Sequence, residues 1–249
     1  MFGFLKRKGK ERCLFYKTDI HSHVVPGIDD GSPFVERSVE LVSAMKEWGL
    51  ERIIATPHVT QDKYENTPET VNEAFLELKG ALSDASVDIN IEFAAEYRID
   101  EFFIEQVRKG SLMNLPNGYL LIENSFVQEP LNLDSTLFNL RMAGHKLILA
   151  HPERYAYYHA KRERYDKLHA NGILFQINLL SLAGSYGKDV RKIAEYLIDK
   201  GYVDFIGTDL HRRTHVREIN SYLGSKAYRR HCEQLQGQIQ NDTAFILRS

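Results

Sequence analysis

Residues that commonly bind metal ions follow one apolar run after another along this chain. These residues are His21, His23, His58, Glu96, Glu123, His151, Asp209 and His211. The set combines imidazole nitrogen with carboxylate oxygen and contains no thiolate, which suits Mn, Fe or Zn better than Ca, Mg or Cu(I). So large a set is too many ligands for one ion and suits two or three. Clustered divalent ions of this kind can activate a water molecule for hydrolysis.

The spacing of the first pair supports this interpretation. His21 and His23 are two residues apart at the end of a strand-like run, so in a strand both side chains point the same way. The turn that follows, Gly27-Ile28-Asp29-Asp30-Gly31, holds two carboxylates between glycines. Such a turn is usually solvated, but beside two histidines either carboxylate could be a further ligand.

The elements that must position these residues alternate regularly. Strand-like runs lie at residues 16–20, 51–56, 89–95, 118–123, 145–150, 173–177 and 203–207, with helical patterns between them. Seven β/α units predict an α/β fold with a seven-stranded barrel, one strand short of the usual eight. The carboxyl ends of parallel barrel strands converge on one face, so the candidate ligands are expected to share one pocket.

Local signals mark where some helices begin and end. Ser32-Pro33 and Thr67-Pro68 each place an N-cap residue before a proline, which predicts a helix start. Gly144 and Gly201 are expected to end two later helices.

Length and composition indicate one domain. The chain has 249 residues and a net charge of −2, so no global electrostatic attraction toward nucleic acid or an anionic membrane is expected. Residues 1–15 are predicted to form a flexible N-terminal extension and residues 16–249 a single domain. No segment has the length of a membrane span or of a signal-peptide core.

The residues around the two cysteines argue against a cysteine nucleophile. Cys13 and Cys232 are far apart and form no C-x-x-C pair, which is typical of a reducing compartment. A cysteine-dependent phosphatase requires arginine six residues after its nucleophile, but Asp19 and Gln238 stand there. A cysteine nucleophile is therefore not expected.

Together, several short motifs resemble a known superfamily. They are Asp19-Ile20-His21-Ser22-His23, Asp29-Asp30-Gly31-Ser32, Thr56-Pro57-His58, Ala95-Glu96-Tyr97, Leu121-Ile122-Glu123, Ala150-His151-Pro152-Glu153-Arg154-Tyr155 and Thr208-Asp209-Leu210-His211. The pattern resembles the PHP (polymerase and histidinol phosphatase) superfamily, and within it the bacterial manganese-dependent tyrosine-protein phosphatases of capsule and exopolysaccharide loci. The resemblance covers about residues 16 to 245.

The resemblance implies a distorted seven-stranded, TIM-like (β/α)7 barrel that holds three divalent ions, with Mn favoured and Fe or Zn as alternatives. It assigns the first ion to His21, His23, Glu96 and Asp209. Glu96 would bridge to a second ion shared with Glu123 and His151, and Asp30, His58 and His211 would hold the third. The same comparison selects Asp30 over Asp29.

It further implies that arginines hold the phosphate. Arg154 matches the family position, whereas the second arginine is either Arg212 or Arg213. We expect a metal-bridging hydroxide to attack phosphorus in line while Arg154 binds the equatorial oxygens through its planar fork, without a covalent phosphoenzyme.

The implied substrate is a phosphotyrosine protein, namely a bacterial tyrosine autokinase that controls capsule or exopolysaccharide synthesis. The expected location is the cytoplasm, near the inner face of the membrane. The sequence does not indicate an oligomeric state.

Four alternatives stay open. Histidinol phosphatase or another small-molecule phosphatase would use nearly the same ligands. A metal-dependent amidohydrolase also begins with an HxH pair, but it usually has lysine and histidine where Glu123 and Asn178 stand. A regulatory domain without activity would be expected to lose ligands. A nuclease would need the basic residues at 212–213 and 226–230 to face nucleic acid, where a solvated helix face is the simpler interpretation.

Overall fold

The computed structural model describes residues 12–246 of the chain. Most of the predicted flexible extension, residues 1–11 of 1–15, lies outside this range. Among its last residues, Leu14 is buried, and its backbone N–H donates to the carbonyl of Trp48 at 2.8 Å. Within the described range, no helix is both long and apolar enough to cross a membrane.

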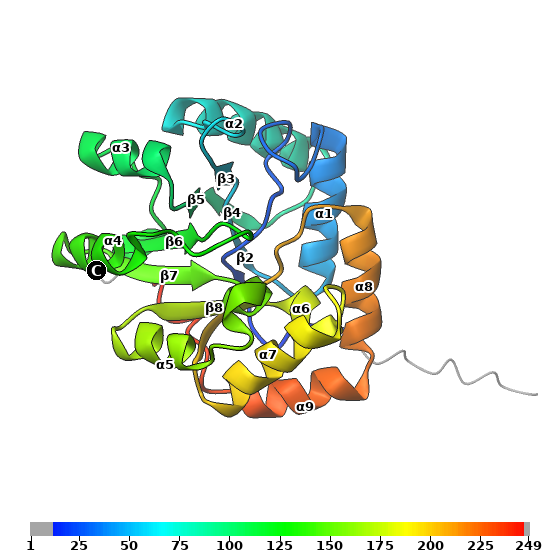
Figure 1. The fold of residues 1–249 in the computed structure, drawn as a ribbon. Coiled ribbons are helices and arrows are strands. Elements are labelled where there is room, and N and C mark those ends of the chain that lie inside the picture. Colours follow the sequence, from blue (N-terminus) through cyan, green and yellow to red (C-terminus); the bar gives the residue numbers. More distant parts are fainter. Residues whose placement is uncertain (1–11, 247–249) are drawn as a thin grey trace, which may run out of the picture.

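Strands and helices alternate along the chain (Figure 1). The strands are β1 (Thr18–Asp19), β2 (Arg52–Ala55), β3 (His58–Val59), β4 (Asn90–Phe93), β5 (Glu96–Arg98), β6 (Tyr119–Glu123), β7 (Lys146–Ala150), β8 (Leu174–Asn178) and β9 (Val203–Gly207). The α-helices are α1 (Val35–Glu47), α2 (Pro68–Asp84), α3 (Glu101–Lys109), α4 (Leu133–Met142), α5 (Glu163–Ala170), α6 (Leu179–Ala183), α7 (Lys188–Asp199), α8 (Arg213–Leu223) and α9 (Lys226–Leu235). Short 3-10 turns occupy Pro116–Gly118, Pro152–Arg154 and Ala156–Tyr158.

All strand pairs are parallel, and they form two sheets rather than one seven-stranded sheet. The first sheet has the order β1-β2-β4, and the second has the order β3-β5-β6-β7-β8-β9. The predicted α/β class with parallel strands is confirmed, but the predicted count of seven strands is wrong, because two of the predicted strands are each split in two.

The splits occur just before two candidate ligands. The predicted run 51–56 ends as β2 at Ala55, and Pro57, which has no N–H to donate, separates it from His58 in β3. The run 89–95 ends as β4 at Phe93, and Glu96 opens β5, paired in register with His58.

Backbone hydrogen bonds also join the segments that follow β1 and β9. Asp209 N–H donates to the carbonyl of His21 at 2.8 Å, and His23 N–H donates to the carbonyl of Leu210 at 3.0 Å. These bonds place the HxH pair beside the segment that carries Asp209.

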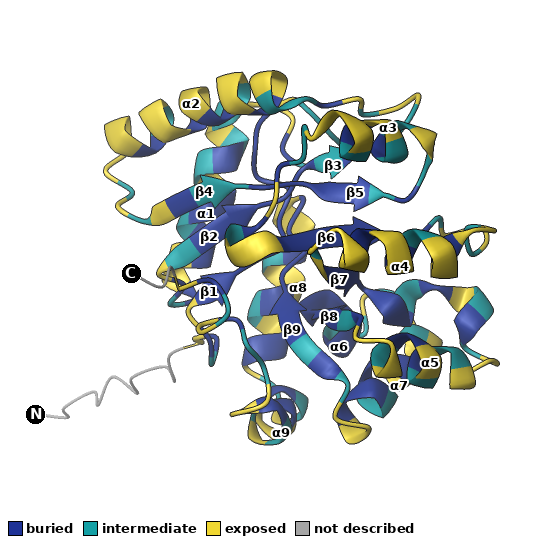
Figure 2. Cartoon of the chain, turned by 90° about the vertical axis from the view of Figure 1, so that its left-hand side faces the viewer, coloured by how far each residue is buried: buried dark blue, intermediate teal, exposed yellow. Residues whose placement is uncertain are grey.

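Burial follows the layers of the fold. Most strand residues are buried, apart from the outer strand β4, and the surrounding helices expose their outer faces (Figure 2). Parallel strands covered by helices carry apolar residues on both faces, as in β6, where all five residues are buried.

The helix-boundary predictions were partly right. Thr67 caps α2, accepting from the backbone N–H of Thr70, with Pro68 as the first helical residue. The helix predicted after Ser32-Pro33 begins later, at Val35, because Ser32 donates its hydroxyl to the carbonyl of Phe34 instead of capping the helix.

Candidate metal centre

The HxH pair meets the Asp209 segment in a buried polar centre. His21 Nε2 and His23 Nε2 lie 3.2 Å apart. Glu96 Oε2 is 3.2 Å from His21 Nε2 and 3.5 Å from His23 Nε2, while Asp209 Oδ1 is 3.4 Å and 3.3 Å from the same two atoms. Two imidazole nitrogens and two carboxylate oxygens thus converge on one point from strands distant in sequence.

Groups that the sequence analysis missed orient these histidines. His21 Nδ1 donates to Gln176 Oε1 at 2.6 Å, and His23 Nδ1 donates to Asp29 Oδ2 at 2.7 Å. Holding Nδ1 in this way leaves Nε2 as the ligand atom, the usual arrangement around metal-binding histidines. Gln176 lies in the middle of β8, and one buried glutamine within a strand gives no signal without the fold.

Glu96 connects the first group to the rest of the site. Its Oε1 lies 2.9 Å from His151 Nε2, and its Oε2 lies 2.9 Å from His58 Nδ1. Glu123 approaches the same two histidines, with 3.5 Å between Oε1 and His58 Nδ1 and 3.9 Å between Oε2 and His151 Nε2. The side chains of both glutamates are fully buried.

The two aspartates of the glycine turn have different environments. Asp29 is buried and accepts from His23, from Gly31 N–H and from His58 N–H. Asp30 is half exposed, with Oδ1 3.5 Å from His58 Nε2 and 3.6 Å from His211 Nε2. Asp29 therefore orients the candidate ligand His23, and Asp30 directs its carboxylate toward His58 and His211.

All nine predicted ligands come together at this centre. Four sets of three have ligand atoms within 4.8 Å of one another: His21, His23 and Glu96; His21, His151 and Asp209; His58, Glu96 and Glu123; and His23, His58 and His211. Asp30 belongs to none of these sets and lies at the rim.

Backbone strain marks two of the strand ends. His151 and Asp209 have φ angles of 36° and 48°, in the left-handed region that non-glycine residues rarely adopt. Such strain persists only where surrounding structure enforces it and often accompanies function. Here the backbone N–H groups of the two residues are held by the carbonyls of Gln176 and His21.

The electrostatics of the centre are those of a site built for cations. Burial alone would lower the pKa of His21, but the carboxylates of Glu96 and Asp209 outweigh it and raise that pKa to about 9. Burial would raise the pKa of Glu96, but His21 and His58 hold it well below its ordinary value. Burial, with help from Glu96, raises the pKa of Glu123. Protons on histidines thus balance the carboxylates, and a divalent cation could replace them.

The donors fit such an ion. Glu96 Oε2 and Glu123 Oε2 are buried and have no hydrogen-bond partner among residues 12–246, and the same holds for His58 Nδ1. An unpaired buried carboxylate oxygen is costly unless a cation binds it. The donor set, nitrogen and oxygen without sulfur, suits Mn, Fe or Zn.

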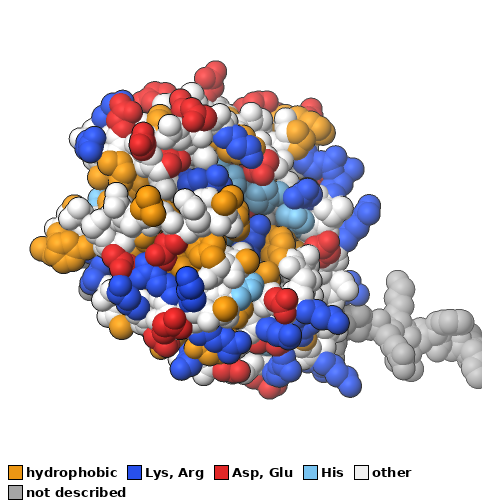
Figure 3. All heavy atoms as spheres, viewed as in Figure 1, with side chains coloured by type: hydrophobic (Ala, Val, Ile, Leu, Met, Phe, Trp, Pro, Cys, Tyr) orange, Lys and Arg blue, Asp and Glu red, His pale blue; other side chains and the backbone are white. Residues whose placement is uncertain are grey.

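The pocket above the centre has a volume of about 260 Å³ and is lined by both acidic and basic side chains. Histidines are visible near the middle of the face drawn in Figure 3, with Lys and Arg side chains beside them. Arg154, Arg212, Arg98 and Lys63 supply the positive charge in the lining.

Arg154 is held on three sides. Its Nη1 donates to Asp209 Oδ2 at 2.9 Å, and its guanidinium carbon lies 4.7 Å from the ring centre of Phe126 and 4.3 Å from that of Tyr186. Both aromatic residues line the pocket, and no motif or spacing in the sequence marks either of them. The aromatic faces restrict the plane of the guanidinium group.

Arg212 and Arg213, the two candidates for the second phosphate-binding arginine, lie in different places. Arg212 lines the pocket, and its Nε donates to His215 Nε2 at 3.2 Å. Arg213 instead pairs at the surface with Glu40 of α1. Arg98, which the sequence analysis did not single out, lines the pocket and donates to Glu123 Oε1 at 3.0 Å.

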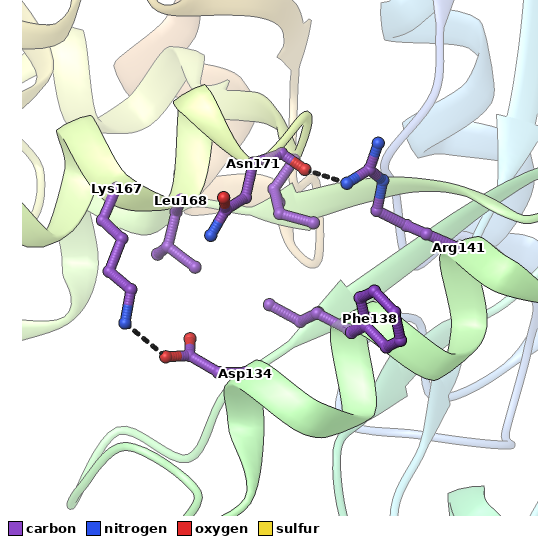
Figure 4. A pocket seen from close by; sticks show the side chains of 8 residues that line it. Asp134, Phe138, Arg141, Lys167, Leu168 and Asn171 are labelled. Carbon is purple, nitrogen blue, oxygen red and sulfur yellow. Dashed lines mark hydrogen bonds and ion pairs between the residues drawn. The ribbon is translucent and has the colours of Figure 1, made fainter.

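A separate cavity of about 280 Å³ lies between α4 and α5 (Figure 4). Apolar side chains such as Leu168 line it, and Asp134 pairs with Lys167 at 2.6 Å at one side of it. It shares no residue with the histidine-lined pocket and contains no cluster of metal-binding groups.

The chain matches the family model described as capsular polysaccharide synthesis, CpsB/CapC, over residues 17–244. The tyrosine-protein phosphatase YwqE of Bacillus subtilis (strain 168) is 29% identical over 236 residues, which cover 91% of this chain and 93% of the relative. The tyrosine-protein phosphatase CpsB of Streptococcus pneumoniae is 29% identical over 201 residues, covering 78% and 82% of the two chains.

Solved structures agree with these relatives. The fold is similar to a chain from the crystal structures of YwqE from Bacillus subtilis and CpsB from Streptococcus pneumoniae, described as unique metal-dependent tyrosine phosphatases. The TM-score is 0.76 and the sequence identity is 28%. The match covers 93% of this chain and 97% of that one. An amidohydrolase from Mycoplasma synoviae, with a TM-score of 0.53 and 12% identity, shares the fold alone. The match over residues 17–244 shows that this chain belongs to the CpsB/CapC family of capsular polysaccharide synthesis.

Proposed function

We propose that this protein is a metal-dependent protein-tyrosine phosphatase. The observation that carries the proposal is the position of Glu96, whose buried and otherwise unpaired Oε2 faces His21, His23 and His58 at 2.9–3.5 Å. The similarity to YwqE and CpsB, which are named tyrosine-protein phosphatases, gives the reaction class.

The finer architecture that we propose is one domain, residues 16–249, folded as a distorted (β/α)7 barrel. Two features support it. Only two residues separate β2 from β3 and β4 from β5, so if each pair is counted as one interrupted strand, the nine strands form seven units. The hydrogen bonds between residues 21–23 and 209–210 join the segments that directly follow β1 and β9, the first and last strands of that series.

We propose three divalent ions, with Mn favoured. His21, His23, Glu96 and Asp209 would hold the first, Glu96, Glu123 and His151 the second, and Asp30, His58 and His211 the third. Bound divalent ions supply an activated water and neutralise phosphate charge.

The residues of the chain contribute binding and orientation. Arg154 would bind two phosphate oxygens through the donors that Asp209 does not occupy, and its planar fork suits that geometry. Arg212 would serve as the second arginine, because Arg213 is engaged by Glu40. Neither Cys13 nor Cys232 lines the pocket, which agrees with a route that uses no cysteine nucleophile.

The proposed substrate is a phosphotyrosine protein, and for a family of capsular polysaccharide synthesis we propose a bacterial tyrosine autokinase. Dephosphorylation of such a kinase would take place in the cytoplasm, near the inner face of the membrane.

The test is hydrolysis of a phosphotyrosine peptide by metal-free protein titrated separately with Mn, Fe, Zn and Mg. We expect strong stimulation by Mn and its loss in His151→Ala and Arg154→Ala, with Arg213→Ala as the matched control that keeps activity. Hydrolysis of histidinol phosphate well above that of the peptide would replace the proposed substrate. Inactivity with every metal would overturn the enzymatic proposal.

A further inference from the structure

The loop between β6 and α4, residues 124–132, exposes apolar side chains at the edge of the catalytic pocket. Phe126 lines the pocket, while Val127 and Leu131 are 86% and 94% exposed. Single exposed apolar residues are common, but three within six residues beside a reactive centre are typical of a binding surface.

The loop is held in place by its polar groups and not by these apolar side chains. Tyr157 donates its hydroxyl to the carbonyl of Ser125 at 2.9 Å. Glu129 accepts from Arg164 Nε and Nη2 at 2.8 and 3.1 Å, and from the hydroxyl of Tyr158. Anchors at Ser125 and Glu129 on this stretch reduce the conformational entropy that the loop loses when it binds a partner.

A groove of about 780 Å³ continues from this loop to α3. Its walls carry on from those of the catalytic pocket. On one side, Arg98 lines the pocket and the next residue, Ile99, lines the groove; on the other, Phe126 lines the pocket, and Pro130 and Leu131 line the groove. The elements that bound the groove, α3 and α4, are neighbours on the left of Figure 1.

The groove combines apolar and acidic side chains. Ile99, Ile104 and Leu131 supply apolar surface. The charged lining residues are Asp100, Glu101, Glu105 and Arg108, so carboxylates outnumber the one positive charge. Glu105 pairs with Lys109 at 2.6 Å, whereas Glu101 has no ion-pair partner within the described chain. This surface complements a segment that carries an apolar residue together with Lys or Arg.

We propose that the groove binds the polypeptide segment flanking the phosphorylated tyrosine, and that it selects substrates with an apolar and a basic residue there. The inference rests on the proposed phosphatase function. It assigns substrate selection to residues that are separate from the metal centre and the phosphate-binding arginines.

The experiment compares three substrates: a phosphotyrosine peptide with Leu and Lys in its flanks, the same peptide with both replaced by Ala, and phenyl phosphate. We expect Leu131→Ser and Glu101→Lys to raise KM for the Leu/Lys peptide about tenfold while leaving kcat and phenyl phosphate hydrolysis unchanged. The matched controls on α2, Leu76→Ser and Glu73→Lys, change exposed side chains outside the groove and should have no effect.

Exchanging the charges of the peptide and of residue 101 gives a second test. A peptide with Glu in place of Lys should regain a low KM with Glu101→Lys, which a general loss of structure would not produce. Unchanged peptide KM in both groove variants, with phenyl phosphate still hydrolysed, would overturn the groove and leave the phosphatase proposal intact. Failure of the wild type to hydrolyse any of the three substrates would overturn the phosphatase proposal itself, and the groove inference with it.

Discussion

The guanidinium carbon of Arg154 lies 4.3 Å from the ring centre of Tyr186, on the wall of the histidine-lined pocket. The ring of Phe126 covers the group at 4.7 Å, and Asp209 occupies Nη1. Arg154 makes no other side-chain hydrogen bond within residues 12–246. Two rings and one carboxylate therefore fix its orientation and leave its remaining donors for a ligand.

Replacing Tyr186 tests whether this contact positions Arg154. Tyr186→Leu removes a cation–π contact worth about 1–2 kcal/mol, so we expect kcat/KM for phosphotyrosine peptide to fall about fivefold to thirtyfold. Tyr186→Phe keeps the aromatic face and should keep the rate. Equal losses in the two variants would show that the hydroxyl matters and not the ring.

The role of Arg154 itself is tested by Arg154→Lys, which keeps the positive charge but removes the planar fork. Because bidentate donation suits the developing charge of the transition state, we expect kcat/KM to fall about 10²-fold or more. Metal content, measured by elemental analysis, should stay at the wild-type level. A variant with full activity would show that Arg154 does not bind the phosphate.

Eight of the nine candidate ligands were accessible from the sequence because they lie at or just after apolar runs, and parallel strands bring their carboxyl ends together. The ninth, Asp30, lies in a glycine turn and was selected mainly by the family resemblance. His21, Glu96 and Asp209 lie far apart in sequence yet meet within 3.5 Å. The sequence could not show the breaks at Pro57 and before Glu96, because a strand of two or three residues has no periodicity of its own.

The groups that orient the candidate ligands were not predictable in the same way. Gln176 and Asp29 act through contacts with His21 and His23 that only the folded chain forms. Tyr186 lies in the segment after α6, where one aromatic residue has no distinguishing spacing. Arg212 and Arg213 were equivalent in the sequence, and the ion pair of Arg213 with Glu40 separates them.

Metal removal should destabilise the protein, because Glu96 and Glu123 then keep unpaired buried oxygens. Adding Mn to metal-free protein at about 100 times its dissociation constant contributes about 2.7 kcal/mol, which is an increase in Tm of roughly 5–10 °C for a domain of this size. Glu96→Gln should lose most of this increase.

Glu153→Gln is the matched control for that measurement. Glu153 is as fully buried as Glu96 but belongs to none of the four metal-binding sets. Its amide would keep an acceptor for the backbone N–H of Asn178, which Glu153 Oε1 now serves at 2.8 Å. The increase in Tm with Mn should be retained. If both variants lost it equally, the effect of Glu96 would be a general consequence of changing a buried carboxylate.

His231 should make stability sensitive to mild acid at a place remote from the metal centre. Burial lowers its pKa below the ordinary 6.5, although Glu195 of α7 opposes that shift and Arg230 and Arg191 add to it. Its neutral ring can accept at Nδ1 from Tyr222 of α8, at 2.6 Å, and donate from Nε2 to Glu195, at 3.2 Å.

A histidine whose pKa is lowered in the folded state binds fewer protons when folded than when unfolded. Its contribution to the free energy of unfolding is therefore present above pH 6.5 and is lost as pH falls through the folded-state pKa. The free energy of unfolding, measured by urea titration from pH 7.5 to 5.0, should therefore fall less steeply in His231→Gln than in the wild type. Identical slopes would show that His231 does not contribute to the acid sensitivity, and the difference between the two proteins cancels the protonation of the metal ligands that both share.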